Sequence, residues 1–494
     1  MAGSISTFPP EVWGWICVLL SRPDLKNLRL VCRVLDEIAQ RTLFETVFLR
    51  VNLNSFERLQ DIARDDKLSQ HVRTVSYDGR TLGRYAASQG FEAWFLCSAG
   101  AGLGLLPASK DKFLAQFSLK QLEEYYFNYC QSLFAQDHIL RRNYEKEMLT
   151  SAFAKFPRLL SVQYAVKSRA ETGITKMAPL LSSLGPVARE ILAEPEDYHG
   201  YLENERHFWT LLQSACFAGH AHQLRSVRGS HLDLRRWNST ATLFIDCYRA
   251  LPVLHHLSLE FELAKHDGGE TTQLADMISH ASSLTSLRLS FDDFSFDDPH
   301  DGIHLSEFIN NEIHWEHLRS LSLQAVVTSE GCLRGLLRRH SQSLRFLELS
   351  NIKFKKPAFP LDGFERGSWI LFIQFLSEHM SLDDIKFDGC FSNQWNEGWV
   401  THDADRERDF GLESVPAQYP HDCLKYRIER YITHNGSCPF IEQTGEVNGE
   451  FYHYHNLPWV FGEDESWRFD YRLIQQTPPD ILVWTVEHDA ISVG

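Results

Sequence analysis

An apolar pattern, L-x-x-L-x-L, recurs along the second half of this chain and constrains its fold more than any other feature. Five strong copies follow one another, with steps of 30, 34, 26 and 38 residues between their first leucines. They are LHHLSL from Leu254, LTSLRL from Leu284, LRSLSL from Leu318, LRFLEL from Leu344 and LDDIKF from Leu382. Because one such segment cannot bury its leucines alone, the series predicts units that stack and cover one another.

Segments with helical periodicity separate several of these copies. Examples are TLFIDCYRALP, LRGLLRRHSQS and WILFIQFLSEHM. Since a strand followed by a helix at this period is typical of leucine-rich repeats, we expect an α/β fold with a repeat solenoid over residues 251–400. Only the copy at Leu382 completes L-x-x-L-x-L-x-x-C, ending at Cys390. The repeats are therefore degenerate, and the curvature of the solenoid stays open.

Three weaker copies precede the strong ones. They are VRTVSY from Val72, LLSVQY from Leu159 and LRSVRG from Leu224. Each is better explained alone as a chance buried strand, and the segment from Ser118 to Pro157 indicates helices with aromatic spacers. We therefore interpret residues 51–250 as an irregular helical and degenerate-repeat region.

The amino-terminal stretch from Phe8 to Phe44 concentrates apolar residues and predicts three short helices. Two prolines fit a first helical turn, where a missing N–H has no partner to lose. Pro23 is expected to end the first helix and Asp24 to cap the second. The apolar faces are expected to hold Val12, Ile16, Leu19 and Leu20 in the first helix, Leu25, Leu28, Val31 and Cys32 in the second, and Leu35, Ile38 and Ala39 in the third.

Three explanations compete for this apolar stretch: a secretion signal, a helical subdomain packed on the rest of the chain, and a docking surface. No Lys or Arg precedes Arg22, which argues against a secretion signal. A unit of roughly forty residues has too much surface for its volume to bury this many large side chains. An apolar face is therefore left over, and such a face usually marks a partner site.

The order of residues in this stretch resembles an F-box, and the resemblance implies an F-box domain over residues 1–50. Phe8-Pro9-Pro10-Glu11, then Ile16 and Leu20, then DLKNLRLVCRVL from Asp24 agree with that family's pattern, although Phe8 stands where a leucine is usual. Only Phe44 supplies the aromatic residue expected near the third helix. The resemblance implies binding to a Skp adaptor, and through it a cullin. The residues expected at that contact are Phe8, Pro9, Pro10, Val12, Ile16, Leu20, Leu25, Leu28, Val31 and Cys32.

Together, the F-box-like stretch and the repeats resemble the F-box leucine-rich-repeat proteins of filamentous fungi. This resemblance implies a non-catalytic substrate-recognition subunit of an SCF-type ubiquitin ligase. The alternative is a repeat scaffold that binds the adaptor without ligase function. In either case, the residues beside the central leucines are expected on one concave face. The candidate partner-binding residues there are Arg288, Gln324, Phe346, Glu348 and Lys386.

Composition excludes several other classes of protein. The net charge is −16, and residues from Asn396 onward hold 7 Lys/Arg against 18 Asp/Glu. This acidity argues against binding to nucleic-acid phosphates or to an anionic membrane. The ten cysteines form no C-x-x-C pair and suit reduced thiols in the cytoplasm or nucleus. The longest uncharged run, Ala93 to Ser109, is broken by glycines and a proline, so no transmembrane segment is expected.

No motif indicates catalysis or a cofactor. His453 and His455, with Glu450 or Asp464, offer a conceivable metal site, but no HExxH, GxSxG or P-loop accompanies them. The glycines from Gly100 to Gly104 lack dinucleotide-binding spacing, and the acidic run from Ser290 to Gly302 favours a solvated loop. Residues 401–494 are acidic and aromatic, which favours a carboxyl-terminal cap, with a substrate-binding annex as the alternative.

Overall fold

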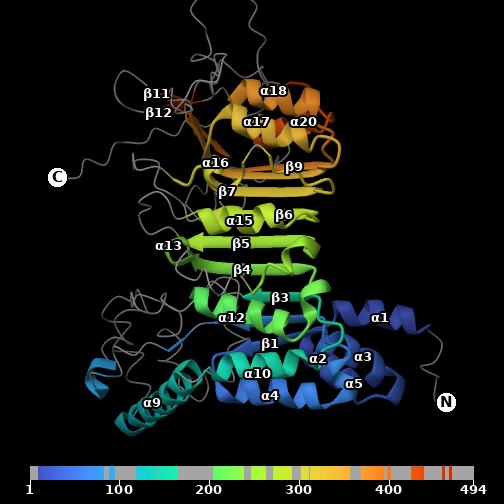
Figure 1. Ribbon diagram of the computed structural model, residues 1–494, viewed down its shortest axis with the longest axis vertical. Coiled ribbons are helices and arrows are strands. Elements are labelled where there is room, and N and C mark those ends of the chain that lie inside the picture. The colour runs from blue at the N-terminus through green and yellow to red at the C-terminus, as the bar shows by residue number, and fades with distance from the viewer. Residues whose placement is uncertain are drawn as a thin grey trace, which may run out of the picture. The chain divides into compact units, whose positions relative to one another are not determined.

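The computed structural model divides the chain into two compact units, Met1–Leu254 and His255–Gly494 (Figure 1). It describes residues 9–79, 81–82, 88, 90–94, 118–141, 143–164, 204–237, 246–262, 271–291, 302–310, 312–355, 369–393, 398–401, 424–438, 459–461 and 467–469. Each unit is an α/β structure in which parallel strands alternate with helices. The α/β class expected from the sequence is thus confirmed.

Three helices open the first unit: α1 (Pro10–Leu19), α2 (Arg22–Leu28) and α3 (Arg33–Glu45). Pro10 lies at the start of α1, as expected. The predicted cap of α2 is wrong: the N-cap is Ser21, whose hydroxyl oxygen accepts from the Asp24 backbone N–H, while Asp24 lies in the first turn. Pro23 likewise lies in the first turn of α2 rather than at the end of α1. In both cases the second helix begins earlier than its apolar residues suggest.

Four parallel strands follow in the first unit: β1 (Thr46–Arg50), β2 (Thr74–Asp78), β3 (Ser161–Tyr164) and β4 (Ser226–Asp233). The first residues of the four strands pair in register, and so do the valines that follow them, Val47, Val75, Val162 and Val227. The three weak copies of the pattern are therefore consecutive members of one sheet. The interpretation of each as an isolated chance strand was wrong.

Helices cover one side of these strands and bury large aromatic rings against them. They are α4 (Leu53–Arg64), α10 (Tyr144–Phe153) and α12 (Asn204–Phe217), and the sequence-predicted α9 (Leu119–Arg141) contacts α4 and α10. Shorter helical pieces are α5 (Asp66–Ser69), η4 (His220–His222), α13 (Leu234–Trp237) and η6 (Leu251–Val253). Phe56, Tyr77 and Trp209 are fully buried between the layers.

Five parallel strands form the sheet of the second unit, each starting two residues after the first leucine of a strong copy. They are β5 (His256–Glu262), β6 (Ser286–Phe291), β7 (Ser320–Thr328), β8 (Phe346–Phe354) and β9 (Asp384–Asn393). Leu257, Leu287, Leu321, Leu347 and Ile385 pair in register across all five. A sixth strand, β10 (Gly398–Thr401), runs antiparallel to β9.

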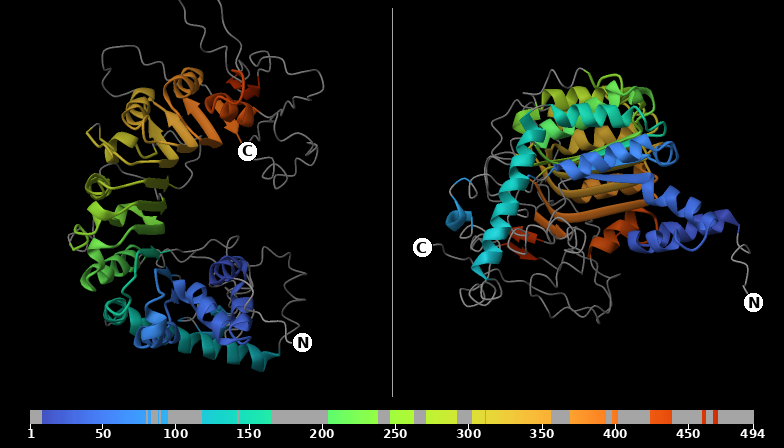
Figure 2. Two further views of the ribbon diagram at one scale, coloured as in Figure 1. Left: turned by 90° about the vertical axis from the view of Figure 1, so that its right-hand side faces the viewer. Right: turned by 90° about the horizontal axis from the view of Figure 1, so that it is seen from below.

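The helices of the second unit lie along one side of its strands (Figure 2, left, yellow to orange). They are α15 (Thr272–His280), α16 (Leu305–Phe308), α17 (Glu330–Arg339) and α18 (Trp369–His379), followed by α20 (Leu424–Ile432), which contacts α18 and β9. The expected helices at α17 and α18 are confirmed. The helix expected in TLFIDCYRALP is not: its described part is a turn over residues 246–250 followed by η6. Strands β11 (Trp459–Phe461) and β12 (Trp467–Phe469) pair antiparallel.

A left-handed residue occupies the sixth position of four strands. These residues are His231 in β4, Ala325 in β7, Asn351 in β8 and Gly389 in β9, with φ of 54°, 54°, 52° and 80°. In β8 the residue marks a shift of register against β9 between Ser350 and Ile352. After the sixth residue, the pattern of buried and exposed side chains is therefore reversed. The reason is that one extra residue moves every later side chain of the strand to the opposite face of the sheet.

Candidate protein-interaction surfaces

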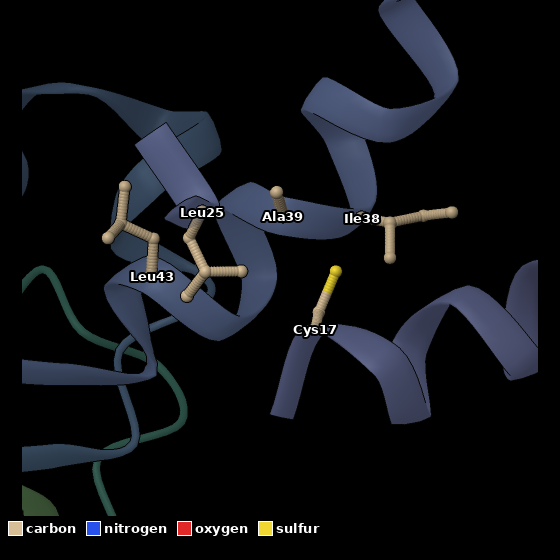
Figure 3. Packing of buried hydrophobic residues seen from close by; sticks show 5 residues of the cluster. All are labelled: Cys17, Leu25, Ile38, Ala39 and Leu43. Carbon is tan, nitrogen blue, oxygen red and sulfur yellow. The ribbon is translucent and has the colours of Figure 1, made fainter. Parts of the chain in front are cut away.

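The three amino-terminal helices share a small core of their own. Cys17 from α1, Leu25 from α2, and Ile38, Ala39 and Leu43 from α3 are buried together (Figure 3). Burial raises the pKa of the Cys17 thiol, which suits a reduced side chain packed among aliphatic groups. This core fixes the angles between the helices. It also determines which side chains of the same helices remain outside.

Six large apolar side chains remain outside that core, and we call them the exposed apolar set. They are Trp15, Val18 and Leu19 on α1, Leu30 and Val31 in the turn after α2, and Val34 on α3, exposed by 72%, 70%, 86%, 85%, 54% and 58%. The first three share a face of α1, since they are three and four residues apart. So many exposed apolar side chains within one short stretch of sequence are typical of a partner site.

The residues expected at the adaptor contact fall into several environments. Leu25 is buried in the core; Pro9, Pro10 and Val31 are exposed; and Val12, Ile16, Leu20, Leu28 and Cys32 are half-buried. Phe8 lies outside the described residues. The expectation that Val31 lines a buried side was wrong, because α2 ends at Leu28 and the turn directs Val31 outward. Leu19, expected on the same face as Val12 and Ile16, is the most exposed of the set.

Sequence reasoning missed Trp15, Val18, Leu30 and Val34 as candidate contacts. Their spacing carried a signal, because Trp15, Val18 and Leu19 form an apolar stripe beside the one that holds Val12, Ile16 and Leu20. When a helix carries two apolar stripes, its own core covers one of them and the other stays exposed. The core of the described residues takes Cys17, with Trp13 and Leu20 packed against it, and Val12 and Ile16 of the expected stripe are not members of that cluster.

Arg22 fastens the three-helix unit to the first strand of the sheet. Its guanidinium Nη2 donates to the carbonyl oxygens of Leu43 at 3.2 Å and Thr46 at 2.9 Å, and its Cζ lies 4.6 Å from the centre of the Phe48 ring. Burial, and secondarily the charge of Arg58, lower the pKa of Arg22 from its usual value. Because α3 ends at Glu45 and β1 begins at Thr46, no linker separates the helices from the sheet.

The second candidate surface is the side of the second-unit sheet that faces away from α15, α17 and α18, which we call the strand face. Side chains alternate along each strand, so the leucines point to the helices and the residues between them to the strand face. Phe346 and Arg288 are 46% and 53% exposed, and Lys386 is exposed, whereas Leu347 and Leu349 are buried. These three candidate residues therefore lie on the side of the sheet opposite the buried leucines.

Register brings three of the five candidate residues into one row. Arg288, Ser322, Glu348 and Lys386 are successive partners on β6 to β9, whereas Phe346 and Gln324 lie in the rows on either side. The Ser322 hydroxyl donates to Oε2 of Glu348 at 2.9 Å, and Nη1 of Arg288 lies 3.7 Å from the same oxygen. Arg288 and Glu348 thus partly neutralise each other across β7.

Neither a candidate metal cluster nor a candidate membrane span occurs in the described part of the chain. No cluster of three or more His, Cys, Asp or Glu side chains there could hold a metal ion. No helix among those residues combines the length and the apolar character that crossing a membrane requires. His453, His455, Gly100 to Gly104, most of the acidic run and most of the expected cap lie outside the described residues.

No protein-family model matches the chain, and no curated protein matches it.

Proposed function

We propose that this chain is the substrate-recognition subunit of an SCF-type E3 ubiquitin ligase. In this proposal the three amino-terminal helices are an F-box that binds a Skp adaptor and, through it, a cullin. The register-aligned strands and their helices form a leucine-rich-repeat-like solenoid, and the strand face binds the protein to be ubiquitinated. The chain itself is not catalytic, needs no cofactor and acts in the cytoplasm or nucleus.

The observation that carries the proposal is the exposed apolar set. Twelve large hydrophobic side chains of the described residues are exposed, and six of them lie between Trp15 and Val34. Water contact at six such side chains is unfavourable by about 25 cal/mol for each Å² of apolar surface, so a partner that covers them gains that free energy. The set lies on the same three helices whose sequence resembles an F-box.

Co-expression with a Skp adaptor tests the first step. We expect the adaptor to co-purify with the intact chain and to be lost in Trp15→Asp and Leu19→Asp variants, because a charge at a buried apolar contact is costly. These positions are exposed, so the variants keep the core of the helices. A Phe134→Asp variant, at a 79% exposed position on α9, is the matched control and should retain the adaptor.

An intact chain that never captures the adaptor would contradict the proposal. A chain that captures it leaves two candidates, the substrate receptor and the scaffold without ligase function. These are distinguished by the ubiquitination and abundance of co-purifying proteins with and without cullin activity. A substrate receptor lowers the abundance of its partner only while the cullin is active.

A further inference from the structure

Phe346 and Asp384 are neighbours on the strand face, and neither side chain has a cationic partner among the described residues. They are register partners on β8 and β9, so their side chains stand next to each other on the same side of the sheet. The Phe346 side chain is 46% exposed, and Asp384 is exposed. Among the described residues, no aromatic ring or guanidinium stacks on Phe346 and no cation lies within ion-pairing distance of the Asp384 carboxylate.

The same combination of groups holds an arginine elsewhere in this molecule. Nε of Arg29 lies 2.7 Å from Oδ1 of Asp36, and the Arg29 Cζ lies 5.8 Å from the centre of the Phe44 ring. A carboxylate and an aromatic ring together offer the guanidinium an ion pair and a cation–π contact. Phe346 and Asp384 present the same two groups with no guanidinium between them.

The cationic side chains near Phe346 and Asp384 in the described part of the chain form no ion pair or cation–π contact with these two residues. Arg288 lies against Glu348, and the Arg345 guanidinium donates to the carbonyl oxygens of Leu344, Gln342 and Ser381. Lys386 stands two residues beyond Asp384 on β9, and no ion pair of its ammonium group occurs among the described residues. Three more carboxylates, of Asp383, Asp388 and Glu348, lie on these two strands or immediately before them. With Asp384 these make four carboxylates, against the three cations Arg345, Lys353 and Lys386 over the same residues, so the net charge is −1 and favours a cation over an anion.

We propose that Phe346 and Asp384 bind an arginine or lysine side chain of the protein that the strand face receives. The cation lies over the ring of Phe346, and its N–H groups donate to the Asp384 carboxylate. Arginine is favoured over lysine, because a planar guanidinium both stacks on a ring and bonds a carboxylate through two N–H groups. This inference deepens the proposed function, since it assigns the chemistry of one contact on the receptor surface.

Selection from a random heptapeptide phage library by the full-length chain tests the subsite. We expect arginine and lysine to be enriched in peptides selected by the wild-type chain, compared with peptides selected by Asp384→Asn and Phe346→Ala variants. The wild-type peptide bound most tightly is then synthesised with its arginine or with uncharged citrulline in that place. Fluorescence polarisation should show about five- to tenfold tighter binding of the arginine form, decreasing with salt.

Asp383→Asn is the matched control, because Asp383 is an exposed carboxylate next to Asp384 on the chain but outside the pair. It removes the same charge and should keep the arginine preference, which separates the subsite from the general acidity of the protein. Lys386→Met should strengthen binding of the arginine peptide, since it removes a nearby positive charge that repels the guanidinium. Equal enrichment by wild-type and Asp384→Asn chains, or no peptide selected by the wild type, overturns the proposal.

The outcome is independent of adaptor binding, because the selection contains no adaptor. Loss of the arginine preference in a chain that captures the Skp adaptor contradicts the subsite alone. An arginine preference in a chain that never captures the adaptor supports the subsite and contradicts the proposed function.

Discussion

His340 illustrates how the interior of the second unit fixes a protonation state. Its Nε2 accepts from the Trp315 backbone N–H at 3.0 Å, so its Nδ1, 2.8 Å from the Leu336 carbonyl oxygen, carries the hydrogen. Burial lowers the pKa of His340, and the nearby His314 and Arg339 lower it further, whereas the Leu336 carbonyl opposes them. A protonated ring would have two N–H donors and would lose the bond from Trp315.

We expect this histidine to make stability depend on pH. The pKa is lower in the folded state than in the unfolded state, where it is about 6.5, so the unfolded chain binds more protons below that value. The free energy of unfolding should therefore fall as pH decreases from 7 toward 5, by at most about 1.4 kcal/mol per pH unit. Urea unfolding of wild type and His340→Gln at several pH values measures the difference, and identical slopes would contradict the assignment.

A second buried histidine is paired with a carboxylate in the first unit. Nδ1 of His207 lies 2.9 Å from each carboxylate oxygen of Glu145, and both residues are at most 1% exposed. Burial, and then the charge of Glu145, raise the pKa of the adjacent Tyr77 well above its usual value. This pair joins α10 to α12 beneath β2 and β3.

Replacing only one residue of the pair is expected to lower the free energy of unfolding more than replacing both with apolar residues. His207→Ala leaves a buried carboxylate without its partner and should lower the free energy of unfolding by about 3–5 kcal/mol. The double variant His207→Phe, Glu145→Leu should recover much of that loss, because apolar groups need no hydrogen bonds there. Chemical denaturation of both variants provides the measurement. A double variant that is less stable than His207→Ala would argue against an electrostatic origin.

At the scale of elements, the left-handed residues set the point up to which the side chains of each strand alternate between the strand face and the core. Up to the sixth residue, alternate side chains of β7, β8 and β9 reach the strand face; beyond it, Val326, Ile352 and Phe391 return to the core in register. Gly389 is one of these residues, and a Cβ atom there would overlap the side chain of Asn351. Only glycine meets both constraints at this position of β9.

Gly389→Ala should therefore destabilise the protein, by roughly 1–3 kcal/mol from the left-handed backbone alone. Gly335→Ala, in the middle of α17, is the control with opposite sign. A Cβ there meets only Nη1 of Arg339, at 3.6 Å, and alanine favours a helix by about 1 kcal/mol over glycine. Thermal unfolding of the two variants should show shifts in opposite directions.

The strands that could be predicted from the sequence are those whose residues follow a recognisable pattern. Leu257, Leu287 and Leu321 define strands and their common side, because the leucines alternate. Strand β1 was missed, since its pattern reads F-E-T-V-F-L from Phe44 and contains one leucine. Of the left-handed residues, Asn351 and Gly389 are types that favour this conformation, whereas Ala325 carries no such signal.

The two candidate interaction surfaces could be predicted only in part, because a sequence pattern shows which residues are apolar but not how they pack. Periodicity finds apolar residues such as Leu20 and Leu25, but only packing decides which of them the core takes. The placement of Arg288 and Glu348 on one side of the sheet followed from alternation alone. Their mutual pairing did not, because it depends on β6 and β8 lying on either side of β7.

For the molecule as a whole, Arg22 connects the proposed adaptor contact to the sheet. We expect Arg22→Ala to leave adaptor capture unchanged, because the exposed apolar set does not include Arg22. Transfer of ubiquitin to a bound partner should fall several-fold, because two hydrogen bonds and a cation–π contact no longer fix the helices on β1. Lys26→Ala, at an exposed cation of the same helix, is the control. Unchanged ubiquitin transfer in Arg22→Ala would contradict a positioning role.

The direct passage from α3 into β1 also affects how the chain can be shortened. Every residue of β1 from Thr46 to Arg50 pairs with β2, so a chain that starts after Arg50 presents β2 as a bare edge with unsatisfied amide and carbonyl groups. Bare edges of this kind recruit strands from other molecules and promote aggregation. Precipitation of such a truncated chain would report an uncovered strand, and would say nothing about a missing adaptor.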